Sequence, residues 1–417
     1  MEILKIKRGN WIYILGFILS LSYIAPSQNL QLLIVAMAFY SAWLFDLCNP
    51  TLLLLVSTVL LNFEGNSLLS LVAILPAFFN KKLFTKKFTV IRLLFYTSLC
   101  FFGMLSYLFG EDSNMFTLLL FFLCWIIYES ASVEELDMNE IQKYAMVGIL
   151  FVCLALLFNV DSNNTVLMYG RLSINDNVRE LANAASISVT LLFCTYFVNE
   201  KNKGNNVIKT LLLGIGLLIL LLTLSKGAIL ALTGTLVVLI LFSKISVSKK
   251  IGILSLFIIF GMVMVYYFSS NSSFRIQRLF EGNISGLSGR TAIWSTYWEA
   301  MKSSPLTFFF GFGPGDIKRL HLISYYSHSL ILDVLFSYGI VGFILFSTMI
   351  VQEFIKSIKS RNNLSIAILA FALLLFSTHS TATNTSFYIL MGISSVMSSM
   401  TILERGEQDE KGSTLCR

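Results

Sequence analysis

Basic side chains in the segments that we predict to lie outside the membrane differ in type from those predicted inside. Six of the nine outer ones are arginine, whereas only five of the other 21 are. Positive charge alone sets membrane orientation, but the planar arginine fork binds phosphate oxygens in pairs, which lysine cannot do. The set predicts an outer phosphate or pyrophosphate site, although any one member is explained more simply as a solvated residue near lipid headgroups. The nine are Arg171, Arg179, Lys226, Arg275, Arg278, Arg290, Lys302, Lys318 and Arg319.

A short amphipathic helix is predicted directly after Arg290. Apolar residues recur there at helical spacing, and the other face is polar. Tryptophan favours the membrane interface, and a helix N-terminus favours anions, so we expect an interfacial helix with Arg290 at its first turn. A helix merely packed on the bundle fits equally well. The apolar positions are Ile293, Trp294, Tyr297, Trp298 and Met301.

The next segment, SSPLTFFFGFGPGD, alternates Gly311, Gly313 and Gly315. No strand–turn–helix unit surrounds these glycines, so they are not a dinucleotide fingerprint. They predict a tight turn with exposed backbone amides, which on its own is a weak signal for a phosphate cradle.

His328 and Asp333 flank the start of a long apolar run. Histidine removes a proton from a hydroxyl near neutral pH, although a histidine at a helix end is more often a cap. A carboxylate within a span is costly and usually functional or paired. Both residues are therefore candidates for the site that the arginines indicate. Lys226, which follows Ser225 at a turn between two apolar runs, is either a further phosphate contact or a turn residue.

Composition requires a membrane to surround most of the chain. The 417 residues are 56% hydrophobic and only 13% charged, against about 25% charged in soluble proteins. We predict an all-α polytopic integral membrane protein with about 12–14 spans of the kind that cross about 30 Å of hydrocarbon. The predicted spans are 11–26, 29–47, 51–63, 66–80, 88–109, 115–129, 143–160, 182–199, 208–224, 226–243, 250–268, 329–350, 364–379 and 385–403.

Short basic loops such as NKKLFTKK orient the N-terminus inside. The acidic segment YESASVEELDMNEIQK fits this orientation poorly. The organisation that follows is a helical part at 1–268 with an outer loop at 161–181, a large outer loop at 269–328, C-terminal helices at 329–403 and a cytoplasmic tail at 404–417. So long an outer loop as 269–328 indicates a function.

Several other functions are disfavoured by the same residues. The net charge of +7 reflects orientation and does not indicate nucleic-acid binding. The six cysteines form no CxxC pair, and the outer carboxylates do not cluster at ligand spacing. We therefore expect neither a metal nor a cofactor.

The order of motifs resembles the C-terminal region shared by bacterial O-antigen polymerases and O-antigen ligases. The matching pattern is a Gly-Arg before a tryptophan-containing helix, a proline and GxG turn, a histidine opening the next helix and GIxG within it. Its members are Gly289, Arg290, Trp294, Pro305, Gly311, Gly313, His328, Gly339 and Gly342. Upstream, Arg171 and the Ser225–Lys226–Gly227 turn are similar to two further family positions. Ser329 and Lys226 depart from the family's asparagine and arginine.

The resemblance implies a GT-C-like membrane glycosyltransferase of the bacterial cytoplasmic membrane, with its site facing the periplasm or cell exterior. It would join polyprenyl-pyrophosphate-linked oligosaccharide repeat units into O-antigen or capsular polysaccharide. The implied catalytic residues are His328 and Arg290. Candidate contacts to pyrophosphate or glycan are Arg171, Arg179, Lys226, Arg275, Arg278, Arg319 and Asp333.

Three alternatives stay open. A ligase that transfers finished glycan to lipid A core shares the same motifs. A flippase or other transporter would more often show repeated halves, of which the sequence has no sign, and a scaffold would leave the arginine–lysine split unexplained. Partners of the proposed enzyme would be the lipid bilayer and a chain-length regulator and flippase of its pathway.

Overall fold

Helices dominate the described part of the chain. The computed structural model describes residues 10–23, 27–61, 72–73, 75–76, 83, 90–110, 114–133, 136, 138–159, 167–168, 171–172, 178–198, 206–223, 225–242, 248, 251, 255, 290–314, 329–377 and 383–415. Within them, Val90–Phe109, Met138–Leu157 and Leu330–Ser360 are long and apolar enough to cross a membrane, and seven shorter apolar helices accompany them. The predicted all-α polytopic membrane protein is confirmed, with one two-stranded hairpin added. The number of spans and the GT-C likeness stay predictions.

The chain divides into two compact units, each built from separate stretches of sequence. Unit 1 holds Met1–Lys81, Glu134–Glu281 and Asn363–Phe371, and unit 2 holds Lys82–Val133, Gly282–Asn362 and Ala372–Arg417. Helix α17 (Asn363–Phe376) therefore contributes to both.

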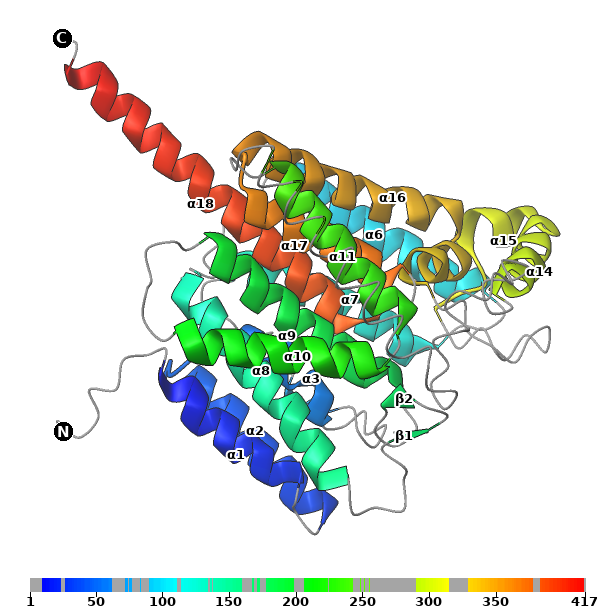
Figure 1. The fold of residues 1–417 in the computed structure, drawn as a ribbon. Helices are drawn as coiled ribbons and strands as arrows, with labels where there is room; N and C mark the ends of the chain where they lie inside the picture. The colour runs from blue at the N-terminus through cyan, green and yellow to red at the C-terminus, as the bar shows by residue number, and fades with distance from the viewer. Residues whose placement is uncertain are drawn as a thin grey trace. The chain divides into compact units, whose positions relative to one another are not determined.

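Unit 1 is organised around two neighbouring helices, α8 (Met138–Asn159) and α9 (Val178–Val198), which pack against each other and most of the unit's other helices. Gly148 allows this close approach, because a Cβ there would lie 2.3 Å from Ser188 Oγ. The remaining elements are α1 (Trp11–Tyr23), α2 (Gln28–Leu44), α3 (Pro50–Leu61), β1 (Leu167–Met168), β2 (Arg171–Leu172), α10 (Asn206–Thr223) and α11 (Lys226–Phe242) (Figure 1).

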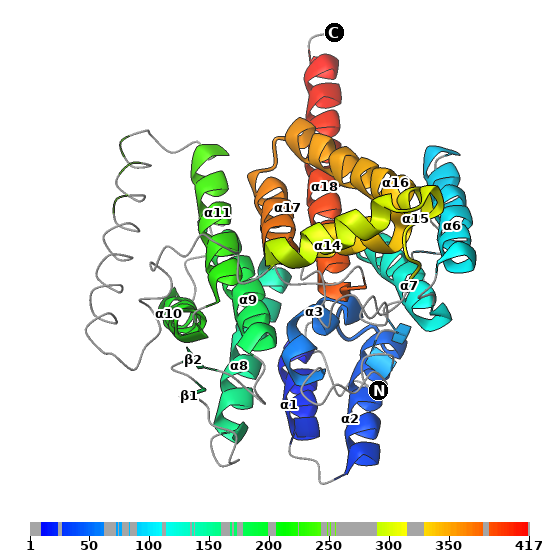
Figure 2. The same cartoon turned by 90° about the vertical axis from the view of Figure 1, so that its right-hand side faces the viewer.

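Unit 2 combines long helices with a group of short ones. The long helices are α6 (Val90–Phe109), α7 (Met115–Ala131), α16 (Leu330–Ser360) and α18 (Thr385–Leu415), and the short ones are α14 (Arg290–Lys302) and α15 (Pro305–Phe310). Figure 2 shows α14 lying crosswise to α18. Helix α18 runs without interruption from the predicted C-terminal span into the predicted tail, and it extends past the unit's other helices (Figure 1).

Helix α16 is interrupted at Gly339, whose backbone angles are φ 66° and ψ −171°. The sequence predicted one continuous span at 329–350, and this is wrong in two respects. Residues 340–360 alone are long enough to cross about 30 Å at 1.5 Å per residue, so the break separates a span from a preceding segment at 330–338. The helix also continues ten residues past the predicted end, to Ser360.

Candidate active site

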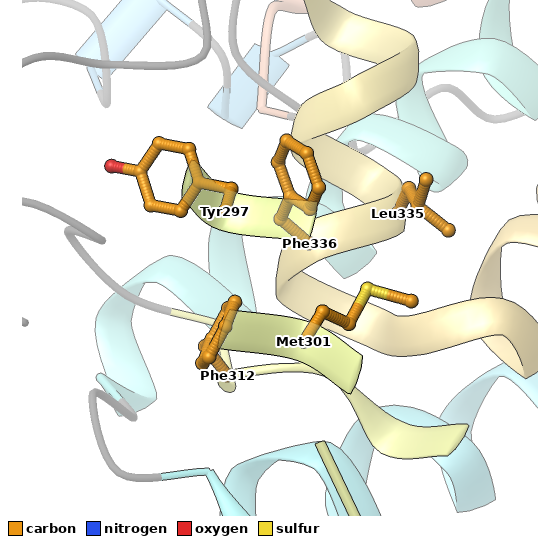
Figure 3. Close-up of a cluster of buried hydrophobic side chains, with 5 residues drawn as sticks. All are labelled: Tyr297, Met301, Phe312, Leu335 and Phe336. Atoms are coloured by element: carbon orange, nitrogen blue, oxygen red, sulfur yellow. The ribbon is translucent and has the colours of Figure 1, made fainter. Parts of the chain in front are cut away.

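The short-helix layer of unit 2 consists of α14, α15 and residues 330–338 of α16, and it has a hydrophobic core of its own. Tyr297 and Met301 of α14 are fully buried against Phe312, Leu335 and Phe336 (Figure 3). The rings of Tyr297 and Phe336 have centroids 5.1 Å apart. This packing fixes the backbone of α14 against the first segment of α16.

The predicted apolar face of α14 is divided between two environments. Tyr297 and Met301 bury into the layer's core, as expected for a helix packed on protein. Trp298 is 39% exposed, and the Lys302 ammonium lies 5.8 Å from its ring centroid. The structure therefore shows that Tyr297 and Met301 of this face pack on protein. The position of α14 at the membrane interface stays a prediction.

The GxG turn locks the layer together through backbone hydrogen bonds. In a continuous helix, the carbonyls of Phe336 and Ser337 would accept from residues 340 and 341, but the break at Gly339 removes those donors. The amides of Phe312 and Gly313 replace them, at 2.8 and 3.0 Å. Gly311, with φ 79° and ψ −172°, places the turn so close that a Cβ at either Gly311 or Gly339 would strike backbone at 2.5 Å or less.

This arrangement corrects the expectation that the turn exposes backbone amides to a phosphate. The amide of Gly311 donates to Thr307 O at 2.9 Å, and those of Phe312 and Gly313 donate to α16. All three are therefore unavailable to a ligand in this structure. Gly311 and Gly313 serve a close backbone crossing, and Gly315 lies outside the described residues.

Three candidate residues of unit 2 occupy the ends of the layer's helices or adjoin them. Arg290 is the first residue of α14, two turns before Tyr297. Asp333 lies half-buried in the first turn of α16, close enough to Tyr338 and Tyr388 to interact electrostatically with both. His328, which precedes the α16 N-cap Ser329, lies outside the described residues.

The candidate basic residues of unit 1 belong to neighbouring elements. Arg171 lies in β2, where it pairs with Met168 of β1, and β2 packs against α10. Lys226 is exposed and opens α11, the helix that follows α10. Arg179 lies in the first turn of α9, which contacts both α10 and α11. Arg171, Arg179 and Lys226, three of the predicted anion contacts, thus all belong to unit 1.

Other predicted site residues lie outside the described part of the chain, namely Arg275, Arg278 and Arg319. No group of three His, Cys, Asp or Glu side chains suited to a metal ion occurs in the part that the structure describes.

Sequence interpretation missed one polar cluster, formed by Arg92, Glu129 and Glu353 of unit 2. The sequence could have indicated this cluster, because its three charged residues lie within otherwise apolar helices, where charges are rare and usually functional or paired.

Truncation of Tyr297 should loosen α14. We expect Tyr297→Ala to cost about 3 to 5 kcal/mol of packing, as for other large buried aromatics, and to speed hydrogen exchange along residues 290–302. Tyr297→Phe keeps the ring and should retain protection. The matched control is Trp298→Ala, because its neighbouring side chain is 39% exposed. Equal exchange in Tyr297→Ala and Trp298→Ala would contradict the role of the core.

Comparison with known families places these elements in context. Residues 211–347 match the family model described as O-antigen ligase. The match runs from α10 to beyond the α16 break, and it includes Lys226, Arg290, the glycine crossing and Asp333. None of the curated proteins that were compared matches the chain. Residues 211–347, about a third of this integral membrane protein, are thus similar to the family described as O-antigen ligase, which supports a relation to the O-antigen ligase and polymerase superfamily.

Proposed function

We propose that this chain is a membrane glycosyltransferase that polymerises polyprenyl-pyrophosphate-linked repeat units into O-antigen or capsular polysaccharide. The observation that carries the proposal is the family match, because it covers the short-helix layer with Arg290 and Asp333 and also the Lys226 turn. Its substrates are lipid-linked oligosaccharides on the outer side of the cytoplasmic membrane. A chain-length regulator and a flippase are its proposed partners.

The reaction needs an acceptor hydroxyl and a leaving group, and the candidate residues suit both. The acceptor oxygen attacks the anomeric carbon of the donor glycan, and its proton passes to His328. The bond from that carbon to the pyrophosphate breaks, and the lipid pyrophosphate leaves with the bonding electrons. Preorganised cationic groups stabilise such developing charge most effectively. We assign this role to Arg290 and Arg171, with Arg179 and Lys226 as further contacts.

Asp333 suits the acceptor side of the same reaction. It lies one turn into α16, five residues after His328, and its carboxylate accepts hydrogen bonds from sugar hydroxyls. Arg275, Arg278 and Arg319 complete the proposed set of glycan or pyrophosphate contacts. The reaction as written requires no metal ion or cofactor.

Substitution of Arg290 or His328 tests the assignment. Arg290→Ala should slow polymer formation by about 100-fold or more, the usual cost of removing one stabilising donor. Arg290→Lys should recover only part of the rate, since lysine cannot bind two oxygens at once. Lys302→Ala is the control on the same helix, because Lys302 pairs with Glu299 at the exposed surface. The readout is the glycan length profile of a deletion strain complemented with each variant at equal protein level.

A ligase is the second candidate, since the matching family model carries that description. The deletion strain separates the two activities. Loss of a polymerase leaves a single repeat on the lipid A core, whereas loss of a ligase leaves none. An intact ladder in the deletion strain would contradict both, and a transport assay for a flippase would follow.

A further inference from the structure

Helix α15 packs against the C-terminal part of α6, a helix of unit 2 that is long and apolar enough to cross a membrane. The ring centroid of Phe310 in α15 lies 6.3 Å from that of Phe102 and 5.7 Å from that of Phe109. Directly after α6, a Cβ on Gly110 would lie 2.4 Å from Gly313 Cα, so the GxG turn approaches the same end of the helix. Both α15 and its turn are therefore held against the last two turns of α6.

The contact with Phe102 sets the depth of α15 along α6. With 20 residues at 1.5 Å per residue, α6 is about as long as the hydrocarbon core of a bilayer is thick. Phe102 precedes Phe109, the last residue of α6, by two turns, which is about 10 Å along the helix axis. A ring that packs on both residues lies beside a part of α6 that is inside the hydrocarbon when α6 crosses it. The sequence had placed residues 305–310 within the large outer loop.

Apolar side chains of α15 are left uncovered by protein. Leu306 and Phe309 are each 49% exposed. The adjoining end of α6 exposes Leu108 and Phe109 in the same way. Contiguous exposed apolar surface marks a protein or membrane contact, and the exposed face of a helix that crosses a bilayer contacts lipid. The apolar surface of α6 thus continues onto α15.

The turn after α15 meets the condition for irregular backbone inside a bilayer. No water is available there, so non-helical backbone is tolerated where it is buried in protein and its polar groups are satisfied internally. Gly311, Phe312 and Gly313 are buried, and their amides all donate to carbonyls of α15 or α16. The Thr307 hydroxyl likewise donates to Met301 O, at 3.0 Å. This turn can therefore lie at membrane depth.

We propose that α15 enters the bilayer as a short re-entrant element, with Leu306 and Phe309 in contact with lipid acyl chains. The preceding helix supplies a polar boundary to this surface. Lys302 of α14 pairs with Glu299 at 2.9 Å, and its ammonium lies 5.8 Å from the Trp298 ring centroid. Tryptophan is enriched at the membrane interface, and lysine there keeps its charge in water while its stem lies on apolar surface. The short-helix layer is thus seated on the bilayer through α15.

Photocrosslinking of the full-length protein in phosphatidylcholine nanodiscs tests the proposal. With p-benzoylphenylalanine in place of Phe309, irradiation should add the mass of a lipid to the intact protein. The same group in place of Leu108, which is 67% exposed on α6, is the reference for lipid contact. The matched control is Glu299 of α14, whose side chain is 72% exposed but lies at the polar boundary. The adduct yield at Phe309 should approach that at Leu108 and clearly exceed that at Glu299.

A photocrosslinker in place of Leu306 repeats the measurement at a second position of α15, so the test does not depend on one variant. Adduct yields at Leu306 and Phe309 no higher than at Glu299 would overturn the proposal. Crosslinks between two copies of the chain in place of lipid adducts would also overturn it, because the surface would then be a protein interface. The readout is a mass and requires no enzymatic activity, so failure here would leave the proposed function standing.

Discussion

Gly339→Ala should abolish polymer formation, although Gly339 carries no functional group. Its φ of 66° and ψ of −171° fall in a backbone region that is essentially restricted to glycine, and occupying it costs other residues about 1–3 kcal/mol. An added Cβ would also lie 2.3 Å from Phe309 O and 2.6 Å from Gly311 N. Backbone atoms cannot rotate away, so the crossing must open and the hydrogen bonds from Phe312 and Gly313 must break.

The measurement is the glycan ladder together with the amount and thermal unfolding midpoint of the purified variant. Gly311→Ala should behave similarly, because φ there is 79° and the Cβ would meet Ser337 backbone at 2.5 Å. Gly214→Ala in α10 is the control, since nothing lies within 4 Å of its Cβ. Alanine there should be neutral or stabilise the helix by about 0.5–1 kcal/mol. A wild-type ladder and melting point in Gly339→Ala would show that the crossing is dispensable.

The sequence predicts most described helix positions closely, because most of these helices correspond to runs of apolar residues. Predicted spans at 115–129, 208–224 and 226–243 correspond to Met115–Ala131, Asn206–Thr223 and Lys226–Phe242. The break in α16 could not be predicted in this way, because it depends on pairing between residues 312–313 and 336–337. Hydrophobicity is uniform through the break, so only GIxG and the alternating glycines indicated a special backbone.

For the candidate site, the sequence predicts which residues to consider but not how they are arranged in space. Residue type and order make Arg290 and Asp333 candidates, and the structure places both at the starts of layer helices. Pattern alone could not show that the hydrophobic core around Tyr297 packs these two helices together.

The structure partly explains why the acidic segment YESASVEELDMNEIQK fits the predicted orientation poorly. Its first carboxylate, Glu129, is buried in α7 and paired with Arg92, so it does not belong to a cytoplasmic loop.

Arg92→Met should destabilise unit 2 by about 3–5 kcal/mol, the usual result of removing one partner from a buried ion pair. The Glu129 carboxylate, 4% exposed, would lose the charge of the Arg92 guanidinium, while the methionine fills similar space. Thermal unfolding in detergent and the level of protein in membranes measure the loss. Lys302→Met is the control, because its pair with Glu299 is largely exposed and such pairs contribute about 0–1 kcal/mol.

A second substitution shows whether the loss arises from charge. Arg92→Met combined with Glu129→Gln removes both members of the closer pair, so the Glu129 charge is no longer left without its guanidinium. Replacing a whole buried pair by uncharged residues is often neutral or stabilising, and the double variant should therefore recover most of the lost stability. If it is as unstable as Arg92→Met, the loss comes from packing of the arginine side chain. Recovery would instead establish that the loss in Arg92→Met comes from the uncompensated charge of Glu129.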